Sequence, residues 1–160
     1  MGYTTDFEGT VSIEPPLNVS EISFLTEFNE TRRMHRSKGP LFVRGSGAYG
    51  QGDDEDIIDN NRPHPDQPGL WCQWTPSNEG HDLEWDGGEK FYNSVEWMRY
   101  IIDHFLKPGA IAKNALPFLQ ANHVCNGEIE AEGESGDDHW KLVVENNKVG
   151  EKQGRVVFDD

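Results

Sequence analysis

The segment from Gly127 to Glu134 constrains the fold more than any other part of the chain, because every second residue in it is a glutamate. In a β-strand, successive side chains point to opposite faces. The alternation therefore predicts a strand with Ile129 and Ala131 on one face and a row of carboxylates on the other. The carboxylates of this row are Glu128, Glu130, Glu132 and Glu134. Such a row repels anionic ligands and attracts cations, basic proteins or water.

The acidity extends to the whole chain, whose formal net charge is −15. Residues 51–100 contribute most of it, since they contain twelve acidic and three basic residues. Binding to a nucleic-acid backbone requires clustered Lys and Arg, so the composition argues against direct nucleic-acid binding. Two interpretations of the surplus charge stay open, namely solubility alone and electrostatic attraction of a protein with a basic surface.

The length of 160 residues predicts a single domain over residues 1–160, and an aromatic content of 11% supplies large apolar side chains for its core. The two cysteines, Cys72 and Cys125, have no metal-binding spacing. No signal-peptide pattern and no apolar run of transmembrane length occur. We therefore expect a cytoplasmic protein with reduced thiols, without cofactor, metal or membrane contact, as a monomer or homodimer.

Capping signals predict two main helices. Asn18 followed by Glu21, and Asn93 followed by Glu96, both have the spacing of a capping box. The first helix should end near Met34, among basic residues that suit a helix C-terminus. Residues 110–122 have room for a further short helix.

Alternating or short apolar runs predict strands in several segments. These segments are 5–13, 41–43, 70–75, 83–85, 127–133, 140–145 and 156–158. Residues 45–69 form a long acidic connection rich in Gly and Pro, and loops of this length are often functional or mobile. The order of elements predicts an α+β two-layer sandwich, in which a mostly antiparallel sheet packs against two main helices.

Several motifs suggest chemistry but lack the context that the chemistry needs. Residues 45–50 match G-x-G-x-x-G, yet the acidic residues 53–56 follow instead of a helix that would bind a diphosphate. The acidic run also lacks EF-hand spacing, so a solvated loop is the default interpretation. A carboxylate/His group occurs at residues 81–86, without any zinc-enzyme motif. A pair of Cys72 with a histidine stays open as a nucleophile, but we assign no catalytic residue.

Aromatic residues concentrate between positions 71 and 97. Trp71 and Trp74 are an odd number of residues apart, so a regular strand would bury one and expose the other. The aromatic group is either core or a binding platform on the loop that enters the second helix. The candidate binding residues are Trp71, Trp74, Trp85, Asp86, Glu89, Lys90 and Tyr92.

Three segments carry a family resemblance, with support from the opening Met1-Gly2-Tyr3-Thr4-Thr5. They are Pro68–Trp74, Glu84–Tyr92 and Asn126–Glu134. Together they resemble a set of small uncharacterised proteins carried by bacteria and bacteriophages. The resemblance spans most of the chain and implies a single intracellular domain of phage or prophage origin. It transfers no activity, so no residue inherits a catalytic role.

The sequence supports three hypotheses about function. The first is a non-enzymatic binding protein that engages a basic or nucleic-acid-handling host protein through its acidic surface and exposed aromatics. The second is a small-ligand-binding protein or hydrolase-like enzyme with a site near residues 81–90. Its polar groups would be His81, Glu84, Asp86, Glu89 and Lys90. The third is an assembly role, with dimerisation through a sheet edge.

Overall fold

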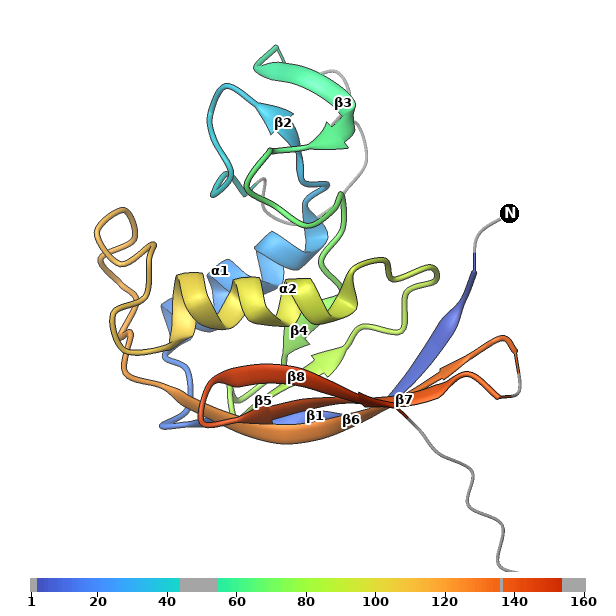
Figure 1. Cartoon of the computed structure of the whole chain (residues 1–160). Helices are drawn as coiled ribbons and strands as arrows, with labels where there is room; N and C mark the ends of the chain where they lie inside the picture. Colours follow the sequence, from blue (N-terminus) through green and yellow to red (C-terminus); the bar gives the residue numbers. More distant parts are fainter. Residues whose placement is uncertain (1–2, 44–54, 136, 154–160) are drawn as a thin grey trace, which may run out of the picture.

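A computed structural model describes residues 3–43, 55–135 and 137–153 of the chain (Figure 1). The fold is α+β, as predicted. The helices and strands follow in this order: β1 (Thr5–Glu14), α1 (Val19–Glu30), β2 (Met34–Arg36), β3 (Ile57–Pro63), β4 (Trp74–Pro76), β5 (Asp82–Trp85), α2 (Ser94–Ile101), the π-helical turn η2 (Ile102–Leu106), β6 (Val124–Gly133), β7 (His139–Glu145) and β8 (Lys148–Gln153).

The main sheet has six antiparallel strands in the order β4-β5-β1-β6-β7-β8. Its centre is the long ladder between β1 and β6, which runs from Thr5 opposite Gly133 to Glu14 opposite Val124. Both helices lie on one side of this sheet, and the small β2–β3 sheet lies beyond them at the top of Figure 1. The described residues therefore leave the other side of the main sheet without a covering helix or strand.

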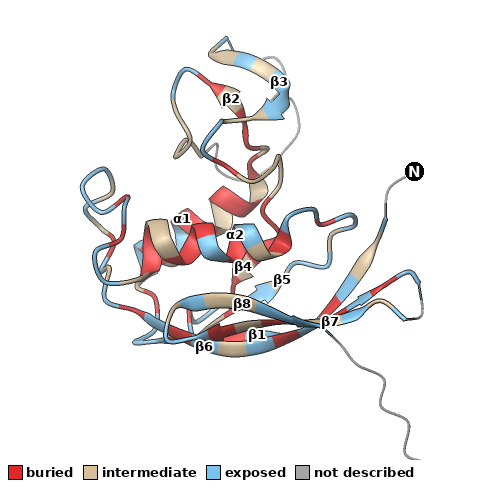
Figure 2. Cartoon of the chain, viewed as in Figure 1, coloured by how far each residue is buried: buried red, intermediate tan, exposed pale blue. Residues whose placement is uncertain are grey.

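The core forms between the sheet and the helices (Figure 2). The predicted inward face of β1 is confirmed, since Phe7, Val11 and Ile13 are buried. On β6, Ile129 and Ala131 are buried as predicted. Burial of each large apolar side chain contributes about 1.5–3 kcal/mol. The helical residues that meet these strands include Phe24, Leu25 and Phe28 of α1 and Trp97, Ile101 and Phe105 of α2 and η2.

The two central strands approach most closely at Gly9 and Gly127. Gly9 has φ +118°, and a Cβ atom there would lie 2.6 Å from the carbonyl oxygen of Glu128. A Cβ atom on Gly127 would lie 2.5 Å from the carbonyl oxygen of Thr10. Only glycine satisfies both positions without displacing the neighbouring backbone.

The predicted end of the first helix near Met34 is wrong. Helix α1 ends at Glu30, because Met34–Arg36 forms strand β2 and pairs with β3. The buried Arg33 side chain donates from Nε to the carbonyl oxygen of Thr31, the C-cap residue of α1, at 3.3 Å. It also donates to the carbonyl oxygens of Pro40 and Phe42, and its guanidinium lies 4.2 Å from the ring centroid of Phe28. The predicted strand at residues 41–43 is a turn followed by irregular chain, and it supplies the Phe42 carbonyl.

Other local predictions also failed for tertiary reasons. Asn93 adopts a left-handed conformation, with φ 59°, and its side chain makes no capping bond but donates to the carbonyl oxygen of Pro68 at 2.6 Å. Residues 110–122 form turns rather than a helix, and Lys113 Nζ donates to the carbonyl oxygens of Pro117 and Leu119. Strands β3 and β8 were not predicted, and residues 156–158 lie outside the described part of the chain.

The predicted capping box at Asn18 is confirmed, and it contains an unexpected ion pair. The backbone N–H of Glu21 donates to Asn18 Oδ1 at 2.7 Å, and Glu21 Oε1 accepts from the Asn18 backbone N–H at 2.9 Å. Glu21 is fully buried, and its Oε2 lies 2.9 Å from Nε2 of the equally buried His123. Nδ1 of His123 lies 2.6 Å from the carbonyl oxygen of Pro15, which can only accept. Both ring nitrogens therefore donate, and His123 is an imidazolium.

At both Glu21 and His123, the hydrogen bonds together shift the pKa further than burial does, and in the opposite direction. Burial by itself would raise the pKa of Glu21, but the hydrogen bonds from His123 and from the backbone N–H groups of Asn18 and Gln120 lower it overall. Burial would lower the pKa of His123, but its bonds to Glu21 and to the Pro15 carbonyl raise it overall. The Glu21 contribution to stability is therefore present above about pH 4.5 and is lost as pH falls. The His123 contribution is present below about pH 6.5 and is lost as pH rises through its raised pKa.

Replacement of His123 by glutamine should destabilise the fold by about 3–5 kcal/mol, because it leaves the buried Glu21 carboxylate without its cation. The loss should be largest between about pH 4.5 and 6.5, where both pKa shifts favour the ionised pair in the wild-type protein. Urea denaturation of the wild type and His123→Gln over pH 4–9 measures this difference. The exposed His139→Gln serves as control. A difference that does not change with pH would contradict the ionised pair.

Candidate functional site

Two surfaces carry the residues that the sequence selected. The first is the acidic face, defined as the outward carboxylates of β5, β1 and β6. Its members are Asp6, Glu8, Glu14, Asp82, Glu84, Glu128, Glu130 and Glu132. All lie on the side of the main sheet that faces away from the helices, because their neighbours along each strand form the core.

The ladder between β1 and β6 places like charges directly opposite one another on the acidic face. Asp6 pairs with Glu132, and Glu8 pairs with Glu130. Side chains in such positions have Cβ atoms about 4.5–5.5 Å apart, and opposed like charges destabilise a sheet. Glu128, Glu130 and Glu132 of the predicted row are thus exposed on one face, and the fold adds a second acidic row beside them.

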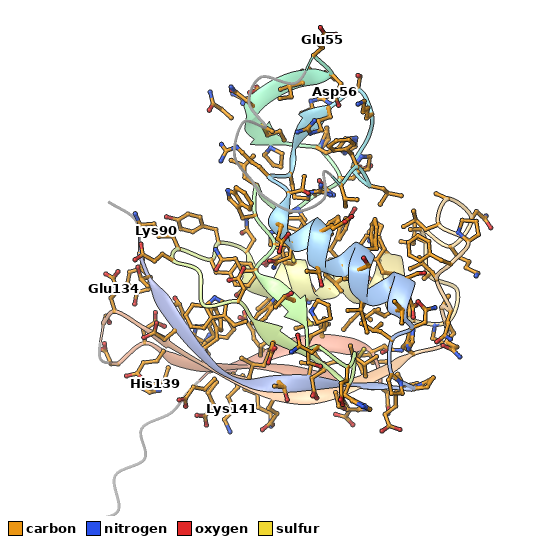
Figure 3. All side chains as sticks on the ribbon, turned by 180° about the vertical axis from the view of Figure 1, so that it is seen from behind. Glu55, Asp56, Lys90, Glu134, His139 and Lys141 are labelled. Atoms are coloured by element: carbon orange, nitrogen blue, oxygen red, sulfur yellow. The ribbon has the colours of Figure 1, made fainter. Side chains whose placement is uncertain are left out.

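Strand β7 supplies partial compensation along one margin of the acidic face. Lys141 Nζ lies 3.7 Å from Glu128 Oε2, and His139 Nε2 lies 3.4 Å from Glu132 Oε1. Figure 3 shows both β7 side chains on the side of the sheet away from the helices. Glu134 lies beyond the end of β6, where its Oε1 accepts from the backbone N–H of Thr4 at 2.7 Å. Glu134 thus holds the N-terminal end of β1 rather than extending the row.

The second surface is the Trp71 pocket, which lies between the C-terminal end of α1 and the segments on either side of the β4–β5 hairpin. It has a volume of about 510 Å³. Its lining residues are Asn29, Glu30, Trp71, Gln73, Asp86, Gly88 and Glu89. Three of the candidate residues, Trp71, Asp86 and Glu89, therefore meet in one pocket.

Two buried amides fix the shape of this pocket. Asn29 Nδ2 donates to the carbonyl oxygen of Cys72 at 2.7 Å, which ties α1 to the chain entering β4. Gln73 donates from Nε2 to the carbonyl oxygen of Glu89 at 3.0 Å and accepts from Trp85 Nε1 at 3.1 Å. Sequence analysis missed both amides, because neither belongs to a motif and Asn29 is distant in the chain.

Asp86 contributes an exposed carboxylate to the pocket. Local burial raises the pKa of its carboxyl group, against the lowering effect of the Gly88 N–H and the Asn29 amide. The Gly88 N–H donates to Asp86 Oδ1 at 2.7 Å. The carboxylate is therefore held in position while it stays open to solvent.

The remaining candidate residues lie outside the pocket lining. Trp74 is 2% exposed and donates from Nε1 to the carbonyl oxygen of Ser94 at 2.8 Å, so it belongs to the core. Trp85 is half-buried against Phe7, with ring centroids 5.4 Å apart. Lys90 and Tyr92 are exposed on the loop before α2. The expectation that one of Trp71 and Trp74 is core agrees with these positions.

The other motifs provide no enzyme-like arrangement within the described residues. His81 faces Glu79 at 3.6 Å, while Glu84 lies on the acidic face and Asp86 lines the pocket. Within residues 3–43, 55–135 and 137–153, no three His, Cys, Asp or Glu side chains gather as metal ligands would. Residues 45–50 and 53–54 lie outside the described ranges, whereas Asp56 pairs with the buried Arg36 at 3.0 Å.

The described helices include none with both the length and the apolar character needed to cross a bilayer. The features that define this protein are thus an α+β fold with an open acidic sheet face and a separate pocket. A scan against family models finds no match, and searches of curated proteins and of solved structures also find none at the threshold applied. The geometry of these two surfaces is therefore the basis on which a function can be inferred.

The two cysteines should resist alkylation in the folded protein. Burial raises the pKa of Cys72 to about 12 and that of Cys125 to about 12, so neither thiol forms a reactive thiolate near neutral pH. Iodoacetamide at pH 8, followed by mass spectrometry, should modify neither residue in the native state and both in urea. Rapid native modification of Cys72 would restore the nucleophile hypothesis.

Proposed function

We propose that this protein is a non-enzymatic binding protein, and that its acidic face engages the basic surface of a partner protein. The observation that carries the proposal is the in-register opposition of carboxylates across β1 and β6 on an exposed side of the sheet. A second chain that brings lysine or arginine to these positions converts repulsion into attraction.

The arrangement of the acidic face supports recognition beyond general solubility. Solubility needs net charge but no alignment, and scattered carboxylates would supply it without opposing Glu8 to Glu130. Adjacent strands instead present two parallel acidic rows, with further carboxylates on β5. A field of one sign accelerates encounters with a basic partner, and salt weakens this effect.

The partner class that fits best is a protein that itself handles nucleic acid. Such proteins carry clustered Lys and Arg for phosphate contacts, and this chemistry is complementary to ordered rows of carboxylates. The resemblance to proteins of bacteria and bacteriophages favours a host factor as the partner of a phage- or prophage-encoded chain. A cytoplasmic location follows from the same proposal.

The Trp71 pocket favours a second candidate function, binding of a small ligand. Its volume of about 510 Å³ falls in the range of about 300–1,000 Å³ that is common for such sites. It combines the indole of Trp71 with the carboxyl group of Asp86. A hydrolase-like activity has less support, because the described pocket lining contains no histidine, serine or cysteine.

Replacement of Glu8 by glutamine should stabilise the fold, because it removes the repulsion from Glu130. The expected gain is about 0.2–1 kcal/mol at low ionic strength. Glu14→Gln is the matched control, since Glu14 lies on the same face of the same strand but opposite Val124. Urea denaturation in 20 mM and 1 M NaCl measures both variants, and the advantage of Glu8→Gln should shrink in high salt. Equal effects of the two variants would show that the opposed carboxylates do not interact.

Neutralisation of the acidic face should abolish capture of the basic partner. The test variant carries Glu8→Gln, Glu130→Gln and Glu132→Gln. The control variant carries Glu55→Gln, Glu96→Gln and Glu151→Gln, which remove the same charge from exposed sites away from the acidic face. Immobilised wild-type and control proteins should retain the same basic protein from bacterial lysate at 50 mM NaCl, and the test variant should not.

The captured protein is then purified for a direct measurement of affinity. Its Kd for the wild type should rise about tenfold or more between 50 and 500 mM NaCl, as expected for recognition through charge. Capture that is equal for the test and control variants, or that is unaffected by salt, would overturn the proposal.

A further inference from the structure

Two polar side chains of the Trp71 pocket already form hydrogen bonds within the protein. The amides of Asn29 and Gln73 are committed to backbone carbonyls and, for Gln73, also to the indole of Trp85. They hold the pocket in shape and offer little to a ligand. The ligand-facing groups are therefore the Trp71 indole and the carboxylates of Asp86 and Glu89.

These groups select a ligand by charge. The pocket lining contains the carboxylates of Asp86 and Glu89 and no lysine, arginine or histidine, so an anionic ligand is repelled. The backbone N–H of Gly88 already donates to Asp86. The carboxylates and the indole ring of the described lining both favour a cationic donor.

The carboxylate of Asp86 retains capacity for such a donor. Its partners among the described residues are the Gly88 N–H and the Asn29 amide. An ionised carboxylate has about four lone-pair sites, so a guanidinium or ammonium group can add further hydrogen bonds. Asp86 is exposed to solvent, so an incoming cation can reach this carboxylate.

A metal ion fits the pocket less well than an organic cation does. Metal ions require several ligands converging on one point, and the described carboxylates of the pocket do not gather in this way. An organic cation instead distributes its contacts between a carboxylate and an aromatic ring, which is the pairing that Asp86 and Trp71 provide. We propose that the Trp71 pocket binds an organic cation, with a guanidinium or ammonium group held at Asp86 and against the indole of Trp71.

This inference rests on the second candidate function, the small-ligand site, and is independent of the acidic face. The same cationic chemistry is available from a free amine and from an arginine side chain of a protein. Agmatine represents the first source, and N-acetyl-L-arginine amide represents the second. N-acetyl-L-citrulline amide is the neutral comparison, because it has nearly the same shape without the charge.

The experiment is titration of the three compounds by calorimetry at 20 mM NaCl. Either cation should bind saturably with one-to-one stoichiometry, and the citrulline compound should bind about tenfold more weakly or not at all. Preferential binding of agmatine assigns the site to free amines, and preferential binding of the arginine amide assigns it to an arginine side chain. Both results support the proposal.

Variants locate the binding in the pocket. Asp86→Asn should weaken binding about tenfold or more, and Trp71→Leu about threefold to thirtyfold. Glu84→Gln is the matched control, because it removes a charge from the same hairpin but on the acidic face, and it should change affinity less than about twofold. Thermal melting confirms that each variant is folded. If Asp86→Asn fails to fold, Trp71→Leu and the citrulline comparison decide the question.

Three results would overturn the proposal: absence of saturable binding by both cations, equal binding of the citrulline compound, or equal weakening by Glu84→Gln. A thermal-shift panel of nucleotides and sugars tests whether the pocket binds any small ligand, even if it does not bind a cation. Stabilisation by a neutral or anionic compound that is lost in Trp71→Leu would retain the pocket as a ligand site while rejecting the cation.

Discussion

The pairing of β1 with β6 determines the rest of the structure. Its register sends Phe7, Val11 and Ile129 toward the helices and the alternate residues, including Glu8 and Glu130, toward the opposite side. A slip of one residue would bury glutamates and expose the core, so the hydrophobic effect fixes this register strongly. The acidic rows and the hydrophobic core are therefore two results of a single alignment, and neither can shift without the other.

Charges inside the fold are treated differently from those on the acidic face. Glu21 is buried with His123, and Arg36 is buried with Asp56. Burial of a charge without such partners costs several kcal/mol. On the acidic face, carboxylates instead oppose carboxylates, and Lys141 on β7 lies beside Glu128 at one margin. The fold thus gives Glu21 and Arg36 an opposite charge and leaves most carboxylates of the acidic face exposed to solvent.

Local sequence patterns predicted those elements that depend on residues close together in the chain. The alternation in β6 identified its two faces, and the spacing of Asn18 and Glu21 identified the start of α1. The same spacing at Asn93 located the start of α2 but not its capping bond, because the Asn93 side chain donates to the carbonyl oxygen of Pro68. A capping motif identifies a side chain that can cap a helix, but a backbone group from a distant segment can bind that side chain instead.

The candidate site was predictable only in part for a similar reason. Trp71, Asp86 and Glu89 were selected because polar and aromatic residues concentrate near the hairpin, and the fold brings them into one pocket. Asn29 gave no signal, since an asparagine within a helix looks like ordinary surface until α1 packs against β4. The His123 partner of Glu21 is 102 residues away, beyond the range of any local pattern.

The central ladder also has a consequence for biosynthesis. Strand β1 precedes the other described strands in the chain, yet its longest pairing is with β6, which begins only at Val124. A ribosome must therefore synthesise the chain through β6 before the central ladder can form, and during this interval one half-apolar edge of β1 stays unpaired.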